Sequence, residues 1–379
     1  MSVPELLGIP MASSNRIDVY SGVSRMAGKV WGSLHRAERP SQTVVVIVHP
    51  SSNFLGHYLL APLAGRGVDT VGLTTRYIGN DSTLIMENCL LDIGSAISFL
   101  RERGYANVVL LGNSGGGGLT AFYQSQAESA TVTQTPAGDP PDLTQAKLPP
   151  ADALLEVMAH PGRALVYADW LDPAIVDERN PFDRDPELDL FGGQHKPPYG
   201  ADFLQRYRAA QLARNRRITA WVRGTLAELG DRRGGLADLP FLVHGTTADP
   251  RFLDVTIDPS DREPGTLWGP TEEANLMPAS LGHYTSLRSW LSQWSVDDSN
   301  CDGPLHLART SVPTLVVYGT ADQVCFPNYA RAMYDAVPHD RKKLQALVGG
   351  THYLQGQPQH IDELADSVSC WLAEQGLRG

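Results

Sequence analysis

The sequence predicts an α/β fold with a mostly parallel central sheet, helices on both faces of that sheet and a largely helical insertion. Three observations lead to this prediction. Short apolar runs alternate with amphipathic segments from the N-terminus to His160, the same kind of run returns after Ser311, and the stretch between them is rich in helix formers and tryptophan. Strands that are buried on both faces of a parallel sheet have such unbroken apolar runs.

The first half of the predicted sheet begins with two short segments of mixed polarity, residues 17–23 and 29–35, which favour antiparallel edge strands. Residues 43–49 follow with the β-branched run TVVVIVH and predict a central strand. Residues 57–65 have a helical composition, and residues 69–76 form a second strand-like run.

A long helix is predicted over residues 82–103, where apolar side chains recur at alternating steps of four and three and Gly104 follows as a C-terminal cap. These side chains are Met86, Leu90, Ile93, Ile97 and Leu100. Residues 106–111 (ANVVLL) predict the next buried strand. The order strand, helix, strand, helix, strand requires a parallel sheet with crossovers on both faces.

The rest of the sheet is predicted in two parts. Residues 129–150 are dense in Thr, Pro, Asp and Gln and favour a surface loop, and residues 153–159 form the next strand. The sheet resumes only at residues 313–318 and 343–348. Residues 361–372 then form a closing amphipathic helix.

The long insertion between these parts, residues 161–310, has no convincing strand pairs. One helical stripe in it follows the i, i+3, i+4, i+7 rule, and we interpret the stripe as packing against a core rather than as a ligand-pocket lining. Its members are Leu287, Trp290, Leu291 and Trp294. We therefore expect a core of residues 1–160 and 311–379, and a cap, or lid, of residues 161–310 inserted after the sixth strand.

The charge excludes some partners. A net charge of -11 repels phosphate backbones and anionic membranes, so we expect neither nucleic acid nor membrane as a partner. The basic cluster of Arg214, Arg216 and Arg217 is typical of a solvated helix face. The sequence does not determine the oligomeric state, and a homodimer stays open.

The cysteines and the N-terminus indicate the compartment. The four cysteines show neither a C-x-x-C pair nor metal-ligand spacing, which favours reduced thiols and no metal: Cys89, Cys301, Cys325 and Cys370. The segment from Met1 to Arg16 lacks a basic start followed by an apolar run, and no segment is apolar enough to span a bilayer. We therefore expect a cytoplasmic protein.

The sequence Gly112-Asn113-Ser114-Gly115-Gly116 fits G-x-S-x-G, with a predicted strand before it and a helix after it. Glycines are needed there because side chains two residues either side of the serine would collide in a sharp strand-to-helix turn. The Gly115 N–H is free at the helix N-terminus and suited to hold a developing oxyanion. A phosphate-binding loop is the alternative interpretation, but no Walker lysine follows.

A serine hydroxyl needs a base to become a nucleophile. We predict that His352 is this base, because it lies in a glycine-rich loop between the last strand and the last helix. Asp322 follows the strand ending at residue 318 and can orient the imidazole. Asp172, in the loop after the strand of residues 153–159, is the alternative acid.

The order Ser114, Asp322, His352, with His49-Pro50 after an early strand, resembles the α/β-hydrolase superfamily over residues 17–160 and from 313 to the C-terminus. The chain looks like a serine esterase or lactonase of that superfamily with an inserted cap. The resemblance implies a Ser-His-Asp triad, a nucleophile elbow at the serine and no cofactor.

The resemblance also implies a second oxyanion donor. In the superfamily a His-Gly turn is common after the equivalent strand, and the residue after this turn supplies a backbone N–H. That residue is Ser51 here, with Ser52 as the next choice, although Pro50 stands where the glycine is usual. We interpret His49 itself, and His160 likewise, as buried histidines that brace turns.

The expected reaction is hydrolysis of a carboxylic ester or lactone through an acyl-enzyme. The small-molecule substrate is expected to be bulky and apolar because the insertion is rich in tryptophan: Trp170, Trp221, Trp268, Trp290 and Trp294. An acyltransferase, a thioesterase and an amidase share this triad and stay open. A binding protein that has kept the fold and lost catalysis is the alternative of another class.

Overall fold

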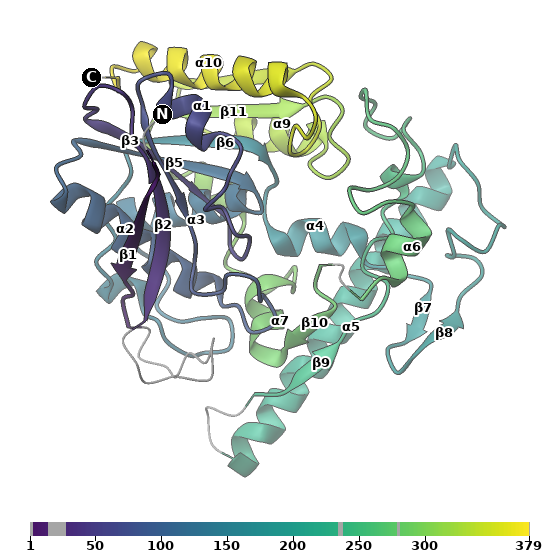
Figure 1. Ribbon diagram of the computed structural model, residues 1–379. Helices are drawn as coiled ribbons and strands as arrows, with labels where there is room; N and C mark the ends of the chain where they lie inside the picture. The colour runs from purple at the N-terminus through teal and green to yellow at the C-terminus, as the bar shows by residue number, and fades with distance from the viewer. Residues whose placement is uncertain (1–2, 14–27, 234–237, 279–280, 379) are drawn as a thin grey trace.

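A computed structural model describes residues 3–13, 28–233, 238–278 and 281–378 of the chain (Figure 1). Its centre is an eight-stranded sheet in the order β1-β2-β4-β3-β5-β6-β11-β12. The strands from β4 to β12 in this order are parallel, and β2 is antiparallel to both of its neighbours. Their bounds are β1 Glu5–Pro10, β2 Lys29–His35, β3 Thr43–Val48, β4 Asp69–Leu73, β5 Asn107–Ser114, β6 Ala153–Ala159, β11 Thr314–Gly319 and β12 Lys342–Leu347.

Helices cover both faces of this sheet, as the sequence predicts. Alternate residues of β3 face opposite ways because successive side chains of a strand point to opposite faces. Val44 and Val46 pack in the cluster that contains side chains of α2 (Met86–Glu102) and α3 (Gly116–Glu128), and Val45 and Ile47 pack with α1 (Leu60–Ala64) and α10 (Pro358–Glu374). A strand with helices on both sides must be apolar throughout, which explains the unbroken run of β3.

The edge of the sheet differs in part from the prediction. Residues 29–35 form the antiparallel strand β2, as predicted. Residues 17–23, predicted as its companion, lie outside the described residues. Glu5–Pro10 pairs with β2 at the edge instead. In this strand of six residues only Leu7 and Ile9 are buried, so its alternating pattern is short. The helix α9, Pro327–Ala336, was not predicted either.

The segment between β6 and β11 separates the sixth and seventh strands of the sheet. Its helices are α4 Arg163–Trp170, α5 Ala201–Arg233, α6 Thr271–Leu276, α7 Leu287–Gln293 and α8 Gly303–Leu307. The prediction that this segment lacks strand pairs is wrong, because it contains two antiparallel strand pairs. They are β7 Ile175–Asp177 with β8 Asn180–Arg184, and β9 Pro240–Leu242 with β10 Tyr284–Ser286. These strands have only three to five residues, too few to carry a recognisable alternating apolar pattern.

The insertion has an apolar cluster of its own, formed mainly by α4, α5 and α7. The predicted stripe of Leu287, Trp290, Leu291 and Trp294 is buried in this cluster. The end of the insertion packs differently, because Cys301 and Leu307 belong to the cluster around α2 and α3. The last residues before β11 therefore pack with the central sheet and its helices.

The four cysteines form no disulfide bond, and Cys89, Cys301 and Cys325 are buried. Within the described residues, no helix combines the length and the apolar character that a membrane span needs.

Candidate active site

Ser114 is the last residue of β5 and stands at the turn into α3. Its φ is +56°, a left-handed conformation that a non-glycine residue adopts only when its surroundings hold it there. A Cβ atom at Gly112 would lie 2.5 Å from the carbonyl oxygen of Gly116, and one at Gly116 would lie 2.2 Å from that of Val48. Both glycines are therefore required by the packing of the turn.

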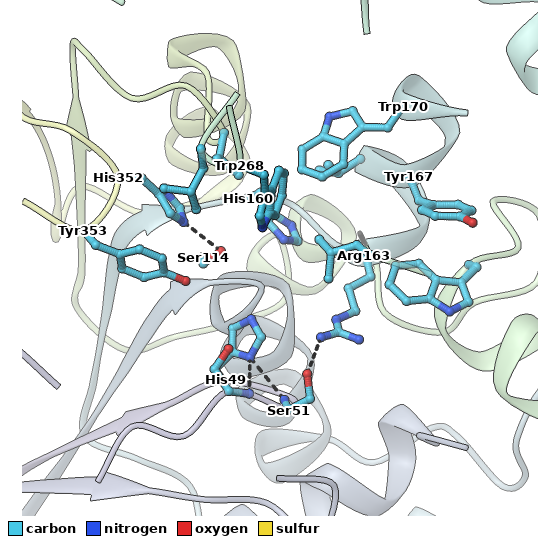
Figure 2. Close-up of a pocket in the computed structure, with 16 residues that line it drawn as sticks. His49, Ser51, Ser114, His160, Arg163, Tyr167, Trp170, Trp268, His352 and Tyr353 are labelled. Carbon is cyan, nitrogen blue, oxygen red and sulfur yellow. Dashed lines mark hydrogen bonds between the residues drawn. The ribbon is translucent and has the colours of Figure 1, made fainter. Parts of the chain in front are cut away.

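His352 lies in the loop between β12 and α10, with its ring directed at Ser114 (Figure 2). Its Nε2 is 3.1 Å from Ser114 Oγ, and its Nδ1 is 2.8 Å from Asp322 Oδ2. An ionised carboxylate only accepts hydrogen bonds, so Nδ1 donates to Asp322 and Nε2 is left to accept from the serine hydroxyl. This tautomer is the one that can take a proton from Ser114.

Asp322 lies in the loop after β11 and is fully buried. Its Oδ1 accepts the backbone N–H groups of Val324 at 2.7 Å and Cys325 at 2.9 Å, which holds the carboxylate in place. Asp172, the alternative acid, is bound elsewhere. Its Oδ2 accepts from Asn275 at 2.8 Å and lies 3.0 Å from a guanidinium nitrogen of Arg184. The structure brings Asp322, not Asp172, to the imidazole.

The two predicted oxyanion donors differ in their surroundings. Gly115 precedes α3, and no described residue accepts a hydrogen bond from its N–H. The N–H groups of Ser51 and of Ser52 both donate to Nδ1 of His49, at 3.1 and 2.8 Å. The backbone donor that the resemblance assigns to Ser51 is therefore already engaged within the turn after β3.

A cavity of about 230 Å³ opens over Ser114 and His352. One part of its wall is aromatic and is supplied by the insertion: Tyr167, Trp170, Trp268 and Trp294. Trp221 and Trp290 do not line it, since Trp221 is half exposed on α5 and Trp290 is fully buried in the insertion. Trp294, interpreted from the sequence as a packing residue, both packs in the insertion and lines the cavity.

No protein-family model matches the sequence, and no curated protein matches it. Solved structures do match. The chain is similar to DcsB in a complex with its substrate analogue, at 11% identity and a TM-score of 0.50 over 98% of this chain and 99% of that one. It is also similar to the esterase domain of a Rhodothermus marinus protein, at 11% identity and a TM-score of 0.48 over 97% of each chain. An alpha/beta fold family hydrolase from Bacillus anthracis str. Sterne aligns at 13% identity and a TM-score of 0.44, over 98% of this chain and 99% of that one.

The strand order and directions, with a serine at the sharp turn after β5, decide the fold. The chain has the α/β-hydrolase fold. At these low identities the likeness concerns the fold alone.

The α/β-hydrolase fold explains why the three side chains meet. Ser114, Asp322 and His352 follow β5, β11 and β12, and the carboxyl ends of parallel strands lie at one edge of the sheet. Segments that are far apart in the sequence therefore converge on one cavity.

Arg163 is a cavity residue that sequence reasoning missed. It is buried at the start of α4, where its guanidinium donates to Ser51 Oγ at 2.7 Å (Figure 2). The guanidinium also donates to Asp81 Oδ2 at 3.0 Å and lies over the ring of Trp294. A lone arginine in a helix-rich segment carries no signal of this position. Only its place directly after His160-Pro161-Gly162, at the end of a strand of the α/β-hydrolase fold, points to the cavity.

Tyr353 also lines the cavity. Burial raises the pKa of Tyr353 to about 12, so that its hydroxyl, which Figure 2 shows near Ser114, stays protonated.

The thiol of Cys325 forms with Asp322 and His352 a group whose donor atoms lie within 4.8 Å of one another. A metal would need a thiolate and a deprotonated ring nitrogen. Burial raises the pKa of the Cys325 thiol, and both oxygens of Asp322 already accept hydrogen bonds, so this group does not fit a metal ion.

The other histidines of the cavity stay uncharged. Burial, with the nearby charges of Arg163 and His352, lowers the pKa of His160 to about 3. Burial also lowers the pKa of His49 well below its usual value. The backbone of His160 braces the elbow, because its N–H donates to the Ser114 carbonyl and its carbonyl accepts from Gly118, both at 3.1 Å.

Proposed function

We propose that the protein is a serine hydrolase that cleaves a carboxylic ester or lactone. The observation that carries the proposal is the continuous series of hydrogen bonds from Asp322 through His352 to Ser114, at 2.8 and 3.1 Å, on the wall of a cavity. A hydroxyl, a neutral imidazole and a buried carboxylate in this order form the arrangement that activates a serine.

In the proposed reaction Ser114 Oγ attacks the substrate carbonyl carbon while His352 Nε2 takes the hydroxyl proton. The carbonyl oxygen becomes negative and accepts from the Gly115 N–H. The imidazolium, stabilised by Asp322, gives its proton to the leaving alkoxide, and the carbon–oxygen bond breaks. Water then attacks the acyl-enzyme by the same steps, with His352 again as the base, and releases the acid and free Ser114.

The volume and the lining of the cavity indicate which substrates fit it. Its volume of about 230 Å³ is below the roughly 300–1,000 Å³ of most small-molecule sites. An acyl group that packs on the aromatic wall of Trp170, Trp268 and Trp294 would fill it. A compact apolar acyl group therefore suits the cavity, and a bulky substrate would need to extend beyond it.

We also propose that residues 161–310 act as the cap and that residues 1–160 and 311–379 form the core. The proposal is supported by the aromatic wall, which comes from the insertion, and by the separate apolar cluster of α4, α5 and α7. The last helix of the insertion, α8, packs on the core and would serve as its attachment.

A fluorophosphonate probe tests the proposed function. We expect the purified protein to be labelled on Ser114, as located by mass spectrometry of the digested adduct, and the variant Ser114→Ala to stay unlabelled. A panel of p-nitrophenyl esters of increasing chain length, lactones, thioesters and anilides then identifies the bond. A protein that carries no label and hydrolyses no compound of the panel would be a binding protein, and the proposal would be wrong.

A further inference from the structure

His49 immediately follows β3, and its ring lies beside the turn at Ser114. The side chain is nearly buried, with 7% exposed, and it lines the cavity. A Cβ atom at Gly115 would lie only 2.9 Å from His49 Nε2. The ring can therefore approach the backbone of Gly115 because that residue has no side chain.

The hydrogen bonds of the ring determine which nitrogen carries the proton. Nδ1 accepts from Ser51 N–H at 3.1 Å and from Ser52 N–H at 2.8 Å. A nitrogen that accepts two N–H groups is unprotonated, so in the neutral ring the proton is on Nε2. Figure 2 shows these two bonds on the side of the ring that points away from Ser114.

Nε2 is then a donor that faces the cavity. Among the residues that the structure describes, none accepts a hydrogen bond from it. The ring also stays neutral, because burial, with the nearby charge of Arg163, keeps its pKa low. A donor on the wall of a cavity that has no partner among the described residues, held in one tautomer, is suited to a ligand atom that becomes negative.

We propose that His49 Nε2–H, together with the Gly115 N–H, holds the substrate oxyanion, in place of the Ser51 N–H. This inference rests on the proposed function and names a further catalytic residue for it. When Ser114 Oγ bonds to the carbonyl carbon, the π electron pair moves to the oxygen, which accepts hydrogen bonds from both groups. His49 keeps its proton throughout, and the proton of Ser114 goes to His352 and then to the leaving group.

The same ring therefore has two functions. Nδ1 accepts the backbone N–H groups of Ser51 and Ser52 in the turn after β3. These two hydrogen bonds fix the ring plane and the tautomer. Ser51 and Ser52 act on the oxyanion only through His49, as positioning residues. This differs from a turn in which a backbone N–H contacts the substrate directly.

Two substitutions separate the functions of the two ring nitrogens. Asparagine places an acceptor near the position of Nδ1 and has no donor near Nε2, whereas glutamine places an amide N–H near Nε2 and loses the acceptor near Nδ1. We expect His49→Asn to lower kcat on the order of 10²-fold with little change in KM, and His49→Gln to stay within roughly tenfold of the wild type. The rate of fluorophosphonate labelling should fall in parallel with kcat, because the phosphonyl oxygen occupies the same place.

The outcomes are distinct. Full activity of His49→Asn, or an inactive His49→Gln beside an active His49→Asn, would overturn the inference and leave the reaction at Ser114 standing. Absence of both labelling and turnover in the wild type would overturn the proposed function and the inference together. Circular dichroism and thermal unfolding of both variants accompany the kinetics.

A second measurement needs no substitution. In protein that contains ¹⁵N-labelled histidine, the Nε2 proton of His49 is expected to shift downfield when Ser114 carries the phosphonyl group. A signal in the same place before and after labelling would overturn the inference.

Discussion

The carboxylate of Asp322 binds the ring of His352 with one oxygen and two backbone N–H groups with the other. The bond to Nδ1 of His352 is 2.8 Å long, and those to the N–H groups of Val324 and Cys325 are 2.7 and 2.9 Å long. The carboxylate is therefore fixed by the chain that follows it, and the imidazole takes its tautomer from the carboxylate.

Replacing Asp322 by asparagine should keep the hydrogen bonds from the N–H groups of Val324 and Cys325 and move the ring proton of His352 from Nδ1 to Nε2. The amide oxygen can still accept from Val324 and Cys325, which turns the amide N–H₂ toward His352 and forces Nδ1 to accept. Nε2 then carries a proton and cannot take one from Ser114. We expect kcat to fall on the order of 10⁴-fold, measured with the best ester of the panel. An Asp322→Asn variant with wild-type kcat would show that Asp322 does not orient the base.

Two variants of Ser114 test the strain at the elbow. Both Ser114→Ala and Ser114→Gly should be inactive, but only glycine adopts a φ of +56° without cost. We expect Ser114→Gly to be about 1 kcal/mol more stable than Ser114→Ala. Urea unfolding of the two variants measures the difference. Equal stabilities would mean that the left-handed conformation stores no strain.

A side chain at Gly116 should destabilise the fold. Its Cβ would meet the Val48 carbonyl oxygen at 2.2 Å, a backbone atom that cannot move aside. We expect Gly116→Ala to lose roughly 1–3 kcal/mol in the free energy of unfolding, together with activity. Gly224, inside α5, is the matched control, since a Cβ there meets nothing within 4 Å. Gly224→Ala should gain about 0.5–1 kcal/mol, and a loss there would contradict the packing described for α5.

The pH dependence of the reaction follows from which histidine is charged. His49 and His160 have lowered pKa values and stay neutral, so they add no step to the profile. A general base must be unprotonated to act, so we expect kcat/KM to rise from acid to neutral pH. Stopped assays in buffers of constant ionic strength measure this rise. A flat profile over that interval would count against His352 as the base.

Glu156 should make the fold less stable as the pH rises. It is buried on β6, only its Oε1 accepts a bond, from Thr120 Oγ1 at 2.9 Å, and burial raises its pKa well above 4.5. The folded state then holds a proton that the unfolded state has released. Stability due to this group is thus present below about pH 4.5 and falls above it, by up to about 1.4 kcal/mol per pH unit, until the folded pKa is reached.

The variant Glu156→Gln removes this titration. We expect its free energy of unfolding to exceed that of the wild type by an amount that grows from pH 4.5 to neutral pH. A difference that stays constant with pH would show that Glu156 titrates alike in the folded and unfolded states.

The elements that the sequence predicts correctly are those whose pattern is local. The unbroken run of β3 and the steps of four and three in α2 need no knowledge of their neighbours, and both elements form as expected. The predicted helix begins at residue 82 and the observed one at Met86. The Met86 N–H, which has no acceptor within its own helix, donates to Ser292 Oγ of α7 at 2.8 Å.

The elements that were missed depend on distant partners. The helix α9 is an exception, because its buried Tyr329, Ala330 and Met333 recur at helical spacing and are a local signal that the prediction passed over. The paired strands of the insertion are too short for a pattern, and β9 pairs with β10 although the helix α6 lies between them in the sequence. No local signal indicates such pairs.

By itself, the sequence determined the fold class and the identity of Ser114, Asp322 and His352 as candidates, because glycine spacing and position after a strand are local properties. Only the tertiary structure decided between Asp322 and Asp172 as the partner of His352, and showed that the N–H of Ser51 ends on His49. Hydrogen-bond partners, and with them the tautomers of imidazoles, exist only once distant segments lie side by side.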